Sequence, residues 1–425
     1  MPQAVALCLD AADIAAAVEW ARRTGTPFAI RGGGHNYSDG SSSRGLLIST
    51  RRMTDAALQG SVLRVQAGIR NSDLARILPM GGTGTQLLPG GTCPNVGVVG
   101  LTLGGGIGPN APWGGLTTDR LREVTMVTAS GDTVTASERQ NADLFWALRG
   151  SAGGNLGVVT DLVYDLVEIP VTRATTVRLV YPTSAITQSA MAWQEARRGN
   201  ETKVAGAWST AATSSGPRAQ VRAQVLLDEA EARDLLAPLL SVPTVSQEIV
   251  ERTWWETYEW YRTPISPSNT FWDRSLYADG ELTSDVLDRI AEVMAVFPDF
   301  KGGSGSFVVN GWVGGQVGSV APGATAYVHR KAKALLEFNS GWPDPVDPQA
   351  WPTPVPSPIR DWMERLWETA YPSTTGLSYQ NFPDPALADR PAAYYGANLA
   401  RLMRVKRACD PEDVFTHSQG IPLRA

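Results

Sequence analysis

The chain opens with a short apolar run, an amphipathic segment and a second apolar run. Residues 4–7 are apolar, Asp10 can cap a following helix, and Gly25 can end it. The apolar positions between these two signals fall on one face of a helix: Ile14, Ala17, Val18 and Ala21. We therefore expect a strand–helix–strand unit, with residues 27–31 as its second strand.

The same patterning predicts further elements before residue 170. Residues 124–126 and 133–135 form a hairpin pattern around the turn residues 130–132. Residues 141–148 predict a short helix, and the apolar run 158–167 predicts a strand.

The middle of the chain has a different composition. Residues from about 171 to 375 alternate strand patterns such as 218–222 with helical patterns such as 285–297, and they hold most of the tryptophans. Residues 391–409 then form a helical pattern that Asp410-Pro411 stops. A length of 425 residues exceeds what one hydrophobic core usually supports, so we expect two domains.

Composition and charge narrow the class of protein. Hydrophobic residues make up 43% and charged residues 19%, as in folded globular proteins. The net charge is −5 and no basic run occurs, which argues against nucleic acid as a partner. Neither a signal peptide nor an apolar run of about 18 residues is present, so we expect a cytoplasmic protein without a membrane partner. Three cysteines and three scattered histidines exclude a disulfide scaffold and argue against a zinc site; we expect no bound metal.

Glycine is concentrated in two regions. Thirteen glycines lie between Gly81 and Gly115, and another glycine loop follows residue 31. Such loops let a ligand approach the backbone, and their N–H groups can surround a phosphate. Neither familiar nucleotide fingerprint fits. In the dinucleotide pattern G-x-G-x-x-G, Pro109 occupies the third glycine position after Gly104 and Gly106, and no glycine loop ends in the Gly-Lys-Ser/Thr of a P-loop.

Four segments together resemble the oxidases related to berberine bridge enzyme, within the vanillyl-alcohol oxidase and p-cresol methylhydroxylase superfamily. The order and spacing of these segments span both ends of the chain. The segments are Arg31-Gly32-Gly33-Gly34-His35-Asn36-Tyr37-Ser38; Gly91-Thr92-Cys93-Pro94-Asn95-Val96-Gly97 through Leu103-Gly104-Gly105-Gly106-Ile107-Gly108; Gly153-Gly154-Asn155-Leu156-Gly157-Val158-Val159-Thr160; and Tyr395-Gly396-Ala397-Asn398 through Gln419.

The resemblance implies FAD bound covalently through two side chains. His35 would be joined to the flavin 8-methyl carbon and Cys93 to flavin C6. Val96 stands where this family controls the access of oxygen, and its small side chain resembles the oxidases rather than the dehydrogenases. The other cofactor-binding residues that the resemblance implies are Arg31, Gly32, Gly33, Gly34, Asn36, Ser38, Gly97, Gly104, Gly105, Gly108, Asn155, Gly157, Val159, Tyr395 and Asn398.

The catalytic motif departs from the family pattern. Relatives often carry the base as the second tyrosine of Tyr-x-Asn-Tyr, whereas this chain has Phe382 there, after Tyr379 and Asn381. We expect Tyr379 to replace it as the base, with Asn381 beside it, which requires the phenol pKa to fall from about 10. The alternative is that Tyr379 only shapes the site.

Substrate contacts are expected in the second domain. Its tryptophans offer flat faces for sugar or aromatic rings, or they belong to the core: Trp254, Trp255, Trp260, Trp312 and Trp342. If residues 307–313 form one strand, Asn310 and Trp312 share a face, an arrangement that suits a carbohydrate.

The resulting prediction is an α+β fold. A two-part FAD-binding domain of the vanillyl-alcohol oxidase type would comprise residues 1–170 and 385–425. A substrate domain with an antiparallel sheet covered by helices would comprise residues 171–384.

The expected function is that of a bicovalently flavinylated oxidase. It would transfer a hydride from a carbohydrate or other secondary alcohol to flavin N5 and then to O2, giving H2O2. Three alternatives stay open: oxidative tailoring of an amine or aromatic glycoside in secondary metabolism, a dehydrogenase with a non-oxygen acceptor, and a flavin-binding protein without catalysis.

Overall fold

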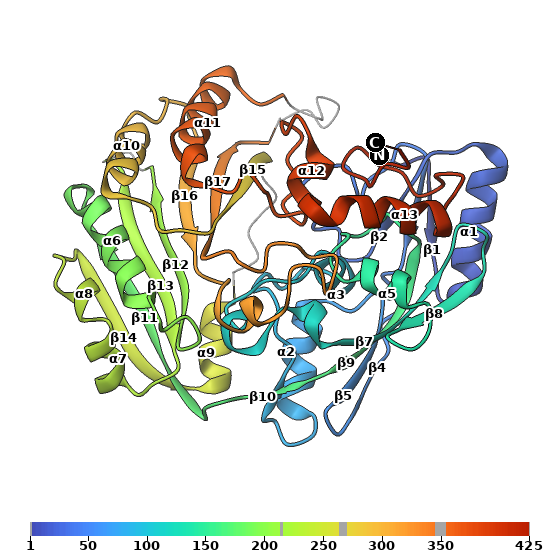
Figure 1. Cartoon of the computed structure of the whole chain (residues 1–425), viewed down its shortest axis with the longest axis horizontal. Helices are drawn as coiled ribbons and strands as arrows, with labels where there is room; N and C mark the ends of the chain where they lie inside the picture. Colours follow the sequence, from blue (N-terminus) through green and yellow to red (C-terminus); the bar gives the residue numbers. More distant parts are fainter. Residues whose placement is uncertain (1, 213–215, 263–269, 345–353, 425) are drawn as a thin grey trace.

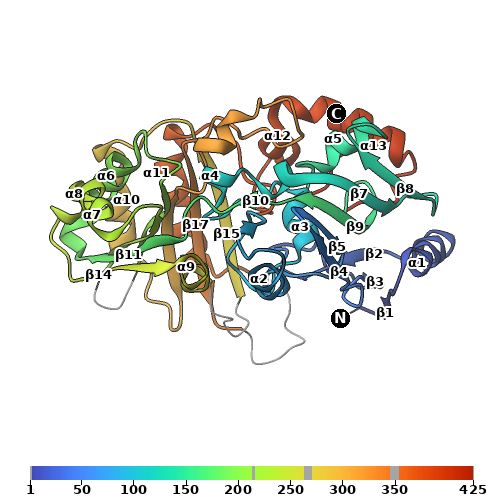
Figure 2. The same ribbon diagram turned by 90° about the horizontal axis from the view of Figure 1, so that it is seen from below.

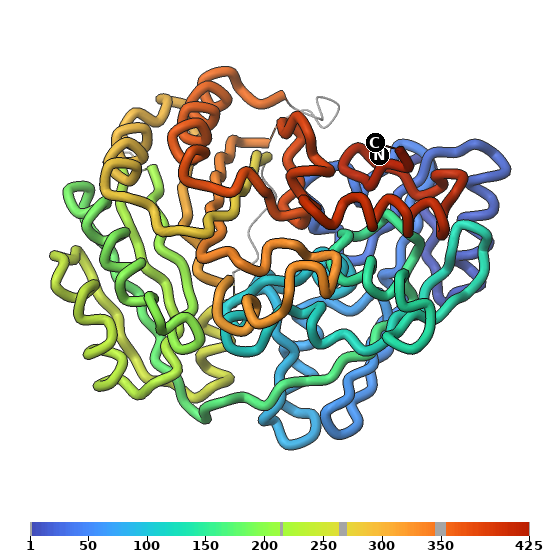
Figure 3. The backbone as a smooth tube through the Cα atoms, in the orientation of Figure 1, coloured from blue at the N-terminus to red at the C-terminus, as the bar shows by residue number. Residues whose placement is uncertain are grey.

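A computed structural model describes residues 2–212, 216–262, 270–344 and 354–424, which form an α+β fold in two parts (Figure 1). One part contains both ends of the chain, blue to cyan and red in Figure 1. The other contains the middle of the chain, green to orange. Figure 3 traces the backbone from the first part into the second and back.

The first part contains two main sheets. A three-stranded parallel sheet has the order β1-β3-β2, and a five-stranded antiparallel sheet has the order β4-β5-β9-β7-β8. The strands are β1 (Ala4–Leu7), β2 (Phe28–Arg31), β3 (Leu46–Ser49), β4 (Ala56–Gln59), β5 (Val62–Gln66), β7 (Leu121–Val127), β8 (Thr133–Ser137) and β9 (Val158–Asp165). A small ribbon pairs β6 (Gln86–Leu87) with β10 (Val167–Glu168), so the run predicted as one strand over 158–167 is divided.

The helices of the first part surround these sheets. They are α1 (Ala11–Thr24), α2 (Asn71–Met80), α3 (Val98–Leu103), α4 (Ala111–Gly114), η1 (Thr117–Arg120), α5 (Ala142–Leu148), α12 (Arg390–Tyr395), η6 (Gly396–Asn398) and α13 (Leu399–Cys409). The C-terminal α13 packs beside α5, although the two are far apart in sequence (Figure 1).

Two predictions for this part have clear outcomes. The predicted cap of α1 is confirmed, since the Asp10 side chain accepts the Asp13 N–H and Gly25 ends the helix at φ +62°. The single helix predicted over 391–409 is wrong, because Gly396 breaks it at φ +45°, a left-handed conformation that favours glycine.

The second part is built on a seven-stranded antiparallel sheet of order β14-β11-β13-β12-β16-β17-β15. Its strands are β11 (Arg173–Tyr181), β12 (Val204–Ala211), β13 (Arg218–Val225), β14 (Ser246–Thr253), β15 (Thr270–Ala278), β16 (Ser304–Asn310) and β17 (Ala334–Trp342). Its helices are η2 (Thr183–Ala185), α6 (Ile186–Arg197), α7 (Glu229–Leu235), α8 (Ala237–Leu240), α9 (Trp254–Tyr261), α10 (Ser284–Ala295), η3 (Gly315–Ser319), α11 (Ser357–Ala370) and η5 (Tyr371–Ser373).

The two faces of this sheet differ in chemistry. Helices α6, α10 and α11 cover one face, where Leu336 and Phe338 of β17 join the hydrophobic core (Figures 1 and 2). Because side chains alternate along a strand, Glu337 and Asn339 lie on the opposite face. The layered arrangement therefore presents polar side chains on the face away from the helices.

The strand predicted over residues 307–313 ends earlier than expected. β16 stops at Asn310, whose side-chain oxygen accepts the backbone N–H of Trp312 at 2.9 Å. Such a local bond competes with the sheet ladder, so Asn310 and Trp312 do not share a strand face.

No helix in the described ranges combines the length and apolarity needed to cross a bilayer.

Candidate active site

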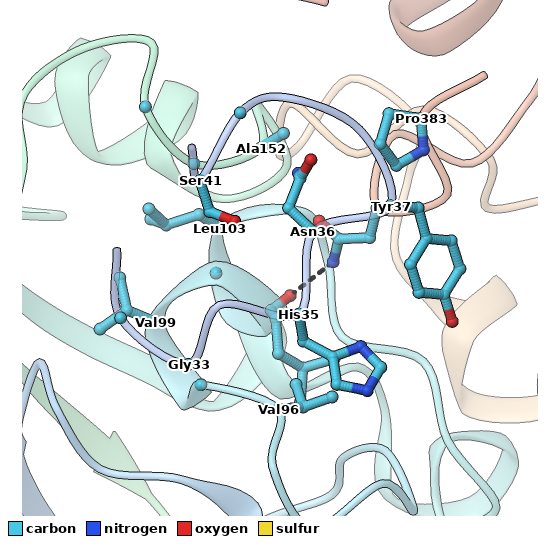
Figure 4. A pocket seen from close by; sticks show the side chains of 18 of the residues that line it. Gly33, His35, Asn36, Tyr37, Ser41, Val96, Val99, Leu103, Ala152 and Pro383 are labelled. Atoms are coloured by element: carbon cyan, nitrogen blue, oxygen red, sulfur yellow. Dashed lines mark hydrogen bonds between the residues drawn. The ribbon is translucent and has the colours of Figure 1, made fainter. Parts of the chain in front are cut away.

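A large cavity of about 350 Å³ brings the predicted glycine loops together with the polar face of the second part (Figure 4). Residues of the first part that line it come mainly from three segments, within 30–41, 91–107 and 152–159, and Thr50 and Ala67 join them. Residues 379–383, His417 and Gln419 complete the wall with Trp312 and Glu337. The walls of this cavity therefore come from residues distant in sequence.

The loops that carry His35 and Cys93 touch each other through glycine. A Cβ on Gly33 would lie 2.2 Å from the backbone nitrogen of Gly97, closer than real Cβ contacts allow. Only residues without a side chain permit this approach. It places His35 and Cys93 on the same cavity.

Each of the two nucleophilic residues is held by its own loop. Asn71 Nδ2 donates hydrogen bonds to the carbonyl oxygens of Gly91 (3.2 Å) and Cys93 (3.1 Å), which fixes the turn that carries the thiol. Partial desolvation lowers the pKa of His35 below its usual value, which favours the neutral imidazole with a free lone pair. A neutral imidazole and a thiol are groups that can form bonds to carbon.

Most of the predicted cofactor residues line this cavity. They are Gly32, Gly33, Gly34, His35, Asn36, Cys93, Val96, Gly97, Gly157 and Val159. Figure 4 shows the side chains of His35, Asn36 and Val96 among those that line it.

The structure places seven other predicted cofactor residues outside the lining, where they support it. Arg31 Nε donates to the Ser41 carbonyl at 2.9 Å, and the Ser38 N–H donates to Asn36 Oδ1 at 2.9 Å, so both shape the first loop. Gly104, Gly105 and Gly108 each sit against another part of the chain, since an added Cβ would lie 2.0 Å from Asn381, 2.6 Å from Tyr327 and 1.7 Å from Gly90. Tyr395 donates its hydroxyl hydrogen to the Ser151 carbonyl at 2.8 Å, and Asn398 donates to the Pro322 carbonyl at 2.8 Å.

Asn155 is also outside the lining and connects the third loop to the C-terminal tail. Its Nδ2 donates to the Ser151 carbonyl at 2.7 Å, and its Oδ1 accepts the Ile421 N–H at 2.9 Å. These bonds hold the tail that carries His417 into the cavity.

Tyr379 lines the cavity, but its environment does not favour a base. Its oxygen accepts hydrogen bonds from the N–H groups of Gly106 (3.2 Å) and Ile107 (3.4 Å) and from Asn381 Nδ2 (3.1 Å). These donors favour the phenolate, yet burial outweighs them and raises the Tyr379 pKa above its usual value. The expected fall in the phenol pKa is therefore absent, and Asn381 holds Tyr379 in place.

The sequence reasoning missed Glu337, the carboxyl that lines this cavity. It lies on β17, where Asn310 Nδ2 donates to its Oε1 at 2.8 Å, and Asn310 itself is outside the lining. Burial raises the pKa of Glu337 to about 7. The signal in the sequence was one charged residue inside the apolar strand pattern of residues 334–338.

An aromatic wall faces the cavity beside this carboxyl. The ring of Tyr37 stacks on Phe382, with centroids 5.2 Å apart and planes at 13°. Phe271 meets the edge of Tyr37 at 5.0 Å. Tyr37 belongs to the first glycine motif, which did not indicate this role. Trp312, predicted as a substrate contact, also lines the cavity.

Several polar atoms in the cavity wall fit a bound polar cofactor. Gln380 Oε1, His417 Nε2, Gln419 Nε2 and Trp312 Nε1 are buried without a hydrogen-bond partner among the described residues. Such atoms usually have partners in proteins. The orphaned polar atoms and the glycine loops match the needs of a dinucleotide with an extended ring system.

Comparison with known proteins agrees with this chemistry. The family model for the FAD binding domain matches residues 2–137, and the berberine and berberine-like model matches residues 378–422. The uncharacterized FAD-linked oxidoreductase YgaK of Bacillus subtilis (strain 168) is 29% identical over 433 residues, covering 99% of this chain and 91% of that protein. The glucooligosaccharide oxidase of Sarocladium strictum is 29% identical over 449 residues, covering 97% and 86%.

Solved structures share the whole fold. The 6-hydroxy-D-nicotine oxidase of Arthrobacter nicotinovorans superposes with a TM-score of 0.86 at 25% identity, covering 99% of this chain and 92% of that one. A glucooligosaccharide oxidase of Acremonium strictum, described with a 6-S-cysteinyl, 8α-N1-histidyl FAD, superposes with a TM-score of 0.87 at 24% identity, covering 100% and 92%.

The fold and the cavity thus define a FAD-linked oxidoreductase. Because both family models match and the similar proteins are FAD-linked oxidoreductases and oxidases, we conclude that this chain is a FAD-dependent oxidase that resembles the berberine bridge enzyme-like proteins.

Proposed function

We propose that this enzyme is bicovalently flavinylated through His35 and Cys93 and oxidises a carbohydrate or another secondary alcohol. Bound FAD would accept a hydride from the substrate C–H bond and pass its electrons to O2, giving H2O2. The observation that carries the proposal is a half-buried carboxyl, Glu337, in the cavity that the two flavin-binding loops line.

The position of the two nucleophiles supports covalent attachment. His35 and Cys93 line one cavity, and the glycine contact between their loops leaves both facing it. The glucooligosaccharide oxidase of the same fold carries FAD on a cysteine and a histidine. Two attachments would anchor the ring while these loops leave room for substrate.

Glu337 is the proton acceptor in this proposal. A base must reach the hydroxyl proton of the substrate, and Glu337 is the carboxyl in the described wall of the cavity. Its raised pKa of about 7 suits proton transfer near neutral pH, because the ionised form is present and still binds a proton well. Tyr379, with its raised pKa, shapes the wall and donates or accepts no proton in the reaction.

Val96 supports oxygen as the electron acceptor. It lines the cavity between Cys93 and the start of α3, and its side chain is small. A dehydrogenase with another acceptor would differ in one respect: its reduced form would persist in air.

One observation favours a second substrate class. The stacked pair Tyr37 and Phe382 gives the cavity an aromatic wall next to a carboxyl, which suits an aromatic amine or glycoside. The fold relative 6-hydroxy-D-nicotine oxidase acts on a compound of this kind. Oxidative tailoring of a secondary metabolite is therefore the second candidate.

A peroxide assay over two substrate panels tests the proposal. Mono- and oligosaccharides form one panel and aromatic amines and glycosides the other, and wild type is compared with Glu337→Gln. Glu281→Gln is the matched control, because this exposed carboxylate pairs with Arg198 at the surface. Peroxide from sugars that is lost in Glu337→Gln and kept in Glu281→Gln supports the proposal. Peroxide from the second panel alone supports the tailoring enzyme. Absence of peroxide with both panels contradicts both candidate functions.

A further inference from the structure

A buried carboxyl, Asp273, lies beside the half-buried Glu337 on the same face of the sheet. Asp273 of β15 is opposite Asn339 of β17, and Ser275 is opposite Glu337. Asp273 and Glu337 are therefore diagonal neighbours across two antiparallel strands, a relation that brings residues to about 7–8 Å. Glu337 lines the cavity, and Asp273 stands behind it.

Each carboxyl receives a hydrogen bond from one neutral amide. Asn339 Nδ2 donates to Asp273 Oδ2 at 3.0 Å, and Asn310 Nδ2 donates to Glu337 Oε1 at 2.8 Å. The other oxygen of Asp273, Oδ1, is buried without a hydrogen-bond partner among the described residues. An amide contributes no positive charge, so these bonds leave the charges of the two carboxyls uncompensated.

Arg274, the cation next to Asp273 in the sequence, forms its ion pairs on the other face of the strand. Arg274 follows Asp273 but points to the opposite face of β15, where it pairs with Asp384 at 2.7 Å and Glu364 at 2.9 Å. Within the described ranges, no ion pair joins a lysine or arginine to Asp273 or Glu337. The buried Asp273 and the half-buried Glu337 thus form an acidic pair without a counter-ion among the described residues.

Other titratable groups near the pair do not neutralise it. Tyr37 from the first loop, Tyr277 of β15 and Tyr379 face the pair as phenols, and burial raises the pKa of each. Burial raises the pKa values of both Asp273 and Glu337, and for Asp273 repulsion from Glu337 adds to this rise. Two neighbouring carboxylates, one buried and one half-buried, cannot both ionise without a cost in free energy.

We propose that Asp273 is a positioning residue that shares a single proton with Glu337, so that one carboxyl of the pair is neutral and the other is the charged base of the cavity. This inference rests on the proposed role of Glu337. When the substrate O–H bond breaks, Glu337 gains its proton and the pair changes from one negative charge to none. Release of that proton restores the starting state.

Infrared spectroscopy of the purified flavoprotein over a pH series tests this pair without substrate. The variants are Asp273→Asn and Glu337→Gln, with Asp279→Asn as the matched control on the exposed loop after β15. We expect the C=O stretch of a neutral carboxylic acid to persist in wild type at about pH 8, where ordinary carboxyls are ionised. In each pair variant this band should disappear at least about one pH unit lower, a tenfold loss of proton affinity, because repulsion no longer favours the proton.

The control variant should titrate as wild type does. Either pair variant is sufficient, so the test survives if one of them does not fold. Absence of the band in wild type, or an unchanged titration in a folded pair variant, overturns the shared proton.

Peroxide production, measured separately, keeps the two proposals apart. If the oxidase is active but the band is absent, the shared proton is contradicted and the proposed function stands. If the band and its shifts in both variants are present but oxidase activity is absent, the proposed function is contradicted and the shared proton stands. The pH profile of substrate oxidation adds a further readout: in Asp273→Asn the rise of turnover with pH should lie at least about one pH unit lower than in wild type, because Glu337 ionises more easily without a second carboxyl beside it.

Discussion

Gly33 and Gly97 lie so close that a Cβ on Gly97 would stand 2.4 Å from the backbone nitrogen of Gly33. This contact joins the loop of His35 to the loop of Cys93, 58 positions apart in the chain. Two side chains can meet one flavin only if their loops are held together, so the glycine contact is the structural basis of the proposed double attachment.

Replacing Gly97 with alanine should separate these loops. The added methyl group has no space, so we expect a loss of about 1–3 kcal/mol in the free energy of unfolding and less covalent FAD. Denaturant unfolding and mass spectrometry of the denatured protein measure the two effects. Gly280→Ala is the control, because nothing lies within 4 Å of its added Cβ; equal behaviour of the two variants would show that the contact does not matter.

The double attachment itself is tested by intact-protein mass spectrometry under denaturing conditions. Wild type, His35→Ala and Cys93→Ala should each retain the mass of one FAD, because either bond alone holds the cofactor. The double variant should lose it. A folded, flavin-containing wild type without added mass would remove both assignments.

Glu337 should set the pH dependence of the reaction. Because its carboxyl must be ionised to accept a proton, turnover should rise with pH through about 7. Glu337→Gln should lower turnover by roughly 10²–10⁴-fold at all pH values, the usual contribution of a general base. Stopped-flow measurement of flavin bleaching by substrate checks the pH dependence and the rate of the variant. If Glu337→Gln keeps the wild-type rate, Glu337 is not the base and Tyr379 is the next candidate.

The raised pKa of Glu337 predicts that the free energy of unfolding falls as pH rises. This is the opposite of the usual case, in which folding lowers the pKa of a carboxyl. Between the ordinary value of 4.5 and about 7, the folded state binds more protons than the unfolded state. Stability should therefore fall as pH rises through this window, and Glu337→Gln should reduce the slope. Thermal unfolding at several pH values measures it, with Glu281→Gln expected to keep the wild-type slope.

Lys406 is expected to be a large determinant of stability. Its buried ammonium donates to the carbonyl oxygens of Asn155 (3.0 Å) and Phe415 (2.7 Å) and pairs with the buried Asp410 at 2.5 Å. Lys406→Met would leave Asp410 unpaired, at a cost of about 3–5 kcal/mol. Denaturant unfolding tests this against Arg404→Met, an exposed change on the same helix expected to have a small effect; similar losses in both variants would contradict it.

Local patterns predicted the regular elements well where the signal was contained in a few residues. The cap at Asp10, the stop at Gly25 and the hairpin of β7 and β8 depend on neighbours in sequence, and the structure contains all of them. The strand end at Asn310 was missed, because a side chain bonding two residues ahead changed the backbone there. The break at Gly396 was missed because helical periodicity continues across it.

The sequence by itself was enough to predict FAD as the cofactor through a family resemblance, because the glycine loops, His35 and Cys93 lie in short motifs that resemble those of the family. It could not determine the proton acceptor. The pairing register of β15 with β17 and the burial of that sheet face place Glu337 at the cavity with Asp273 behind it. These are contacts between residues more than 60 positions apart, and the pKa of a carboxyl depends on such surroundings rather than on its neighbours in the chain.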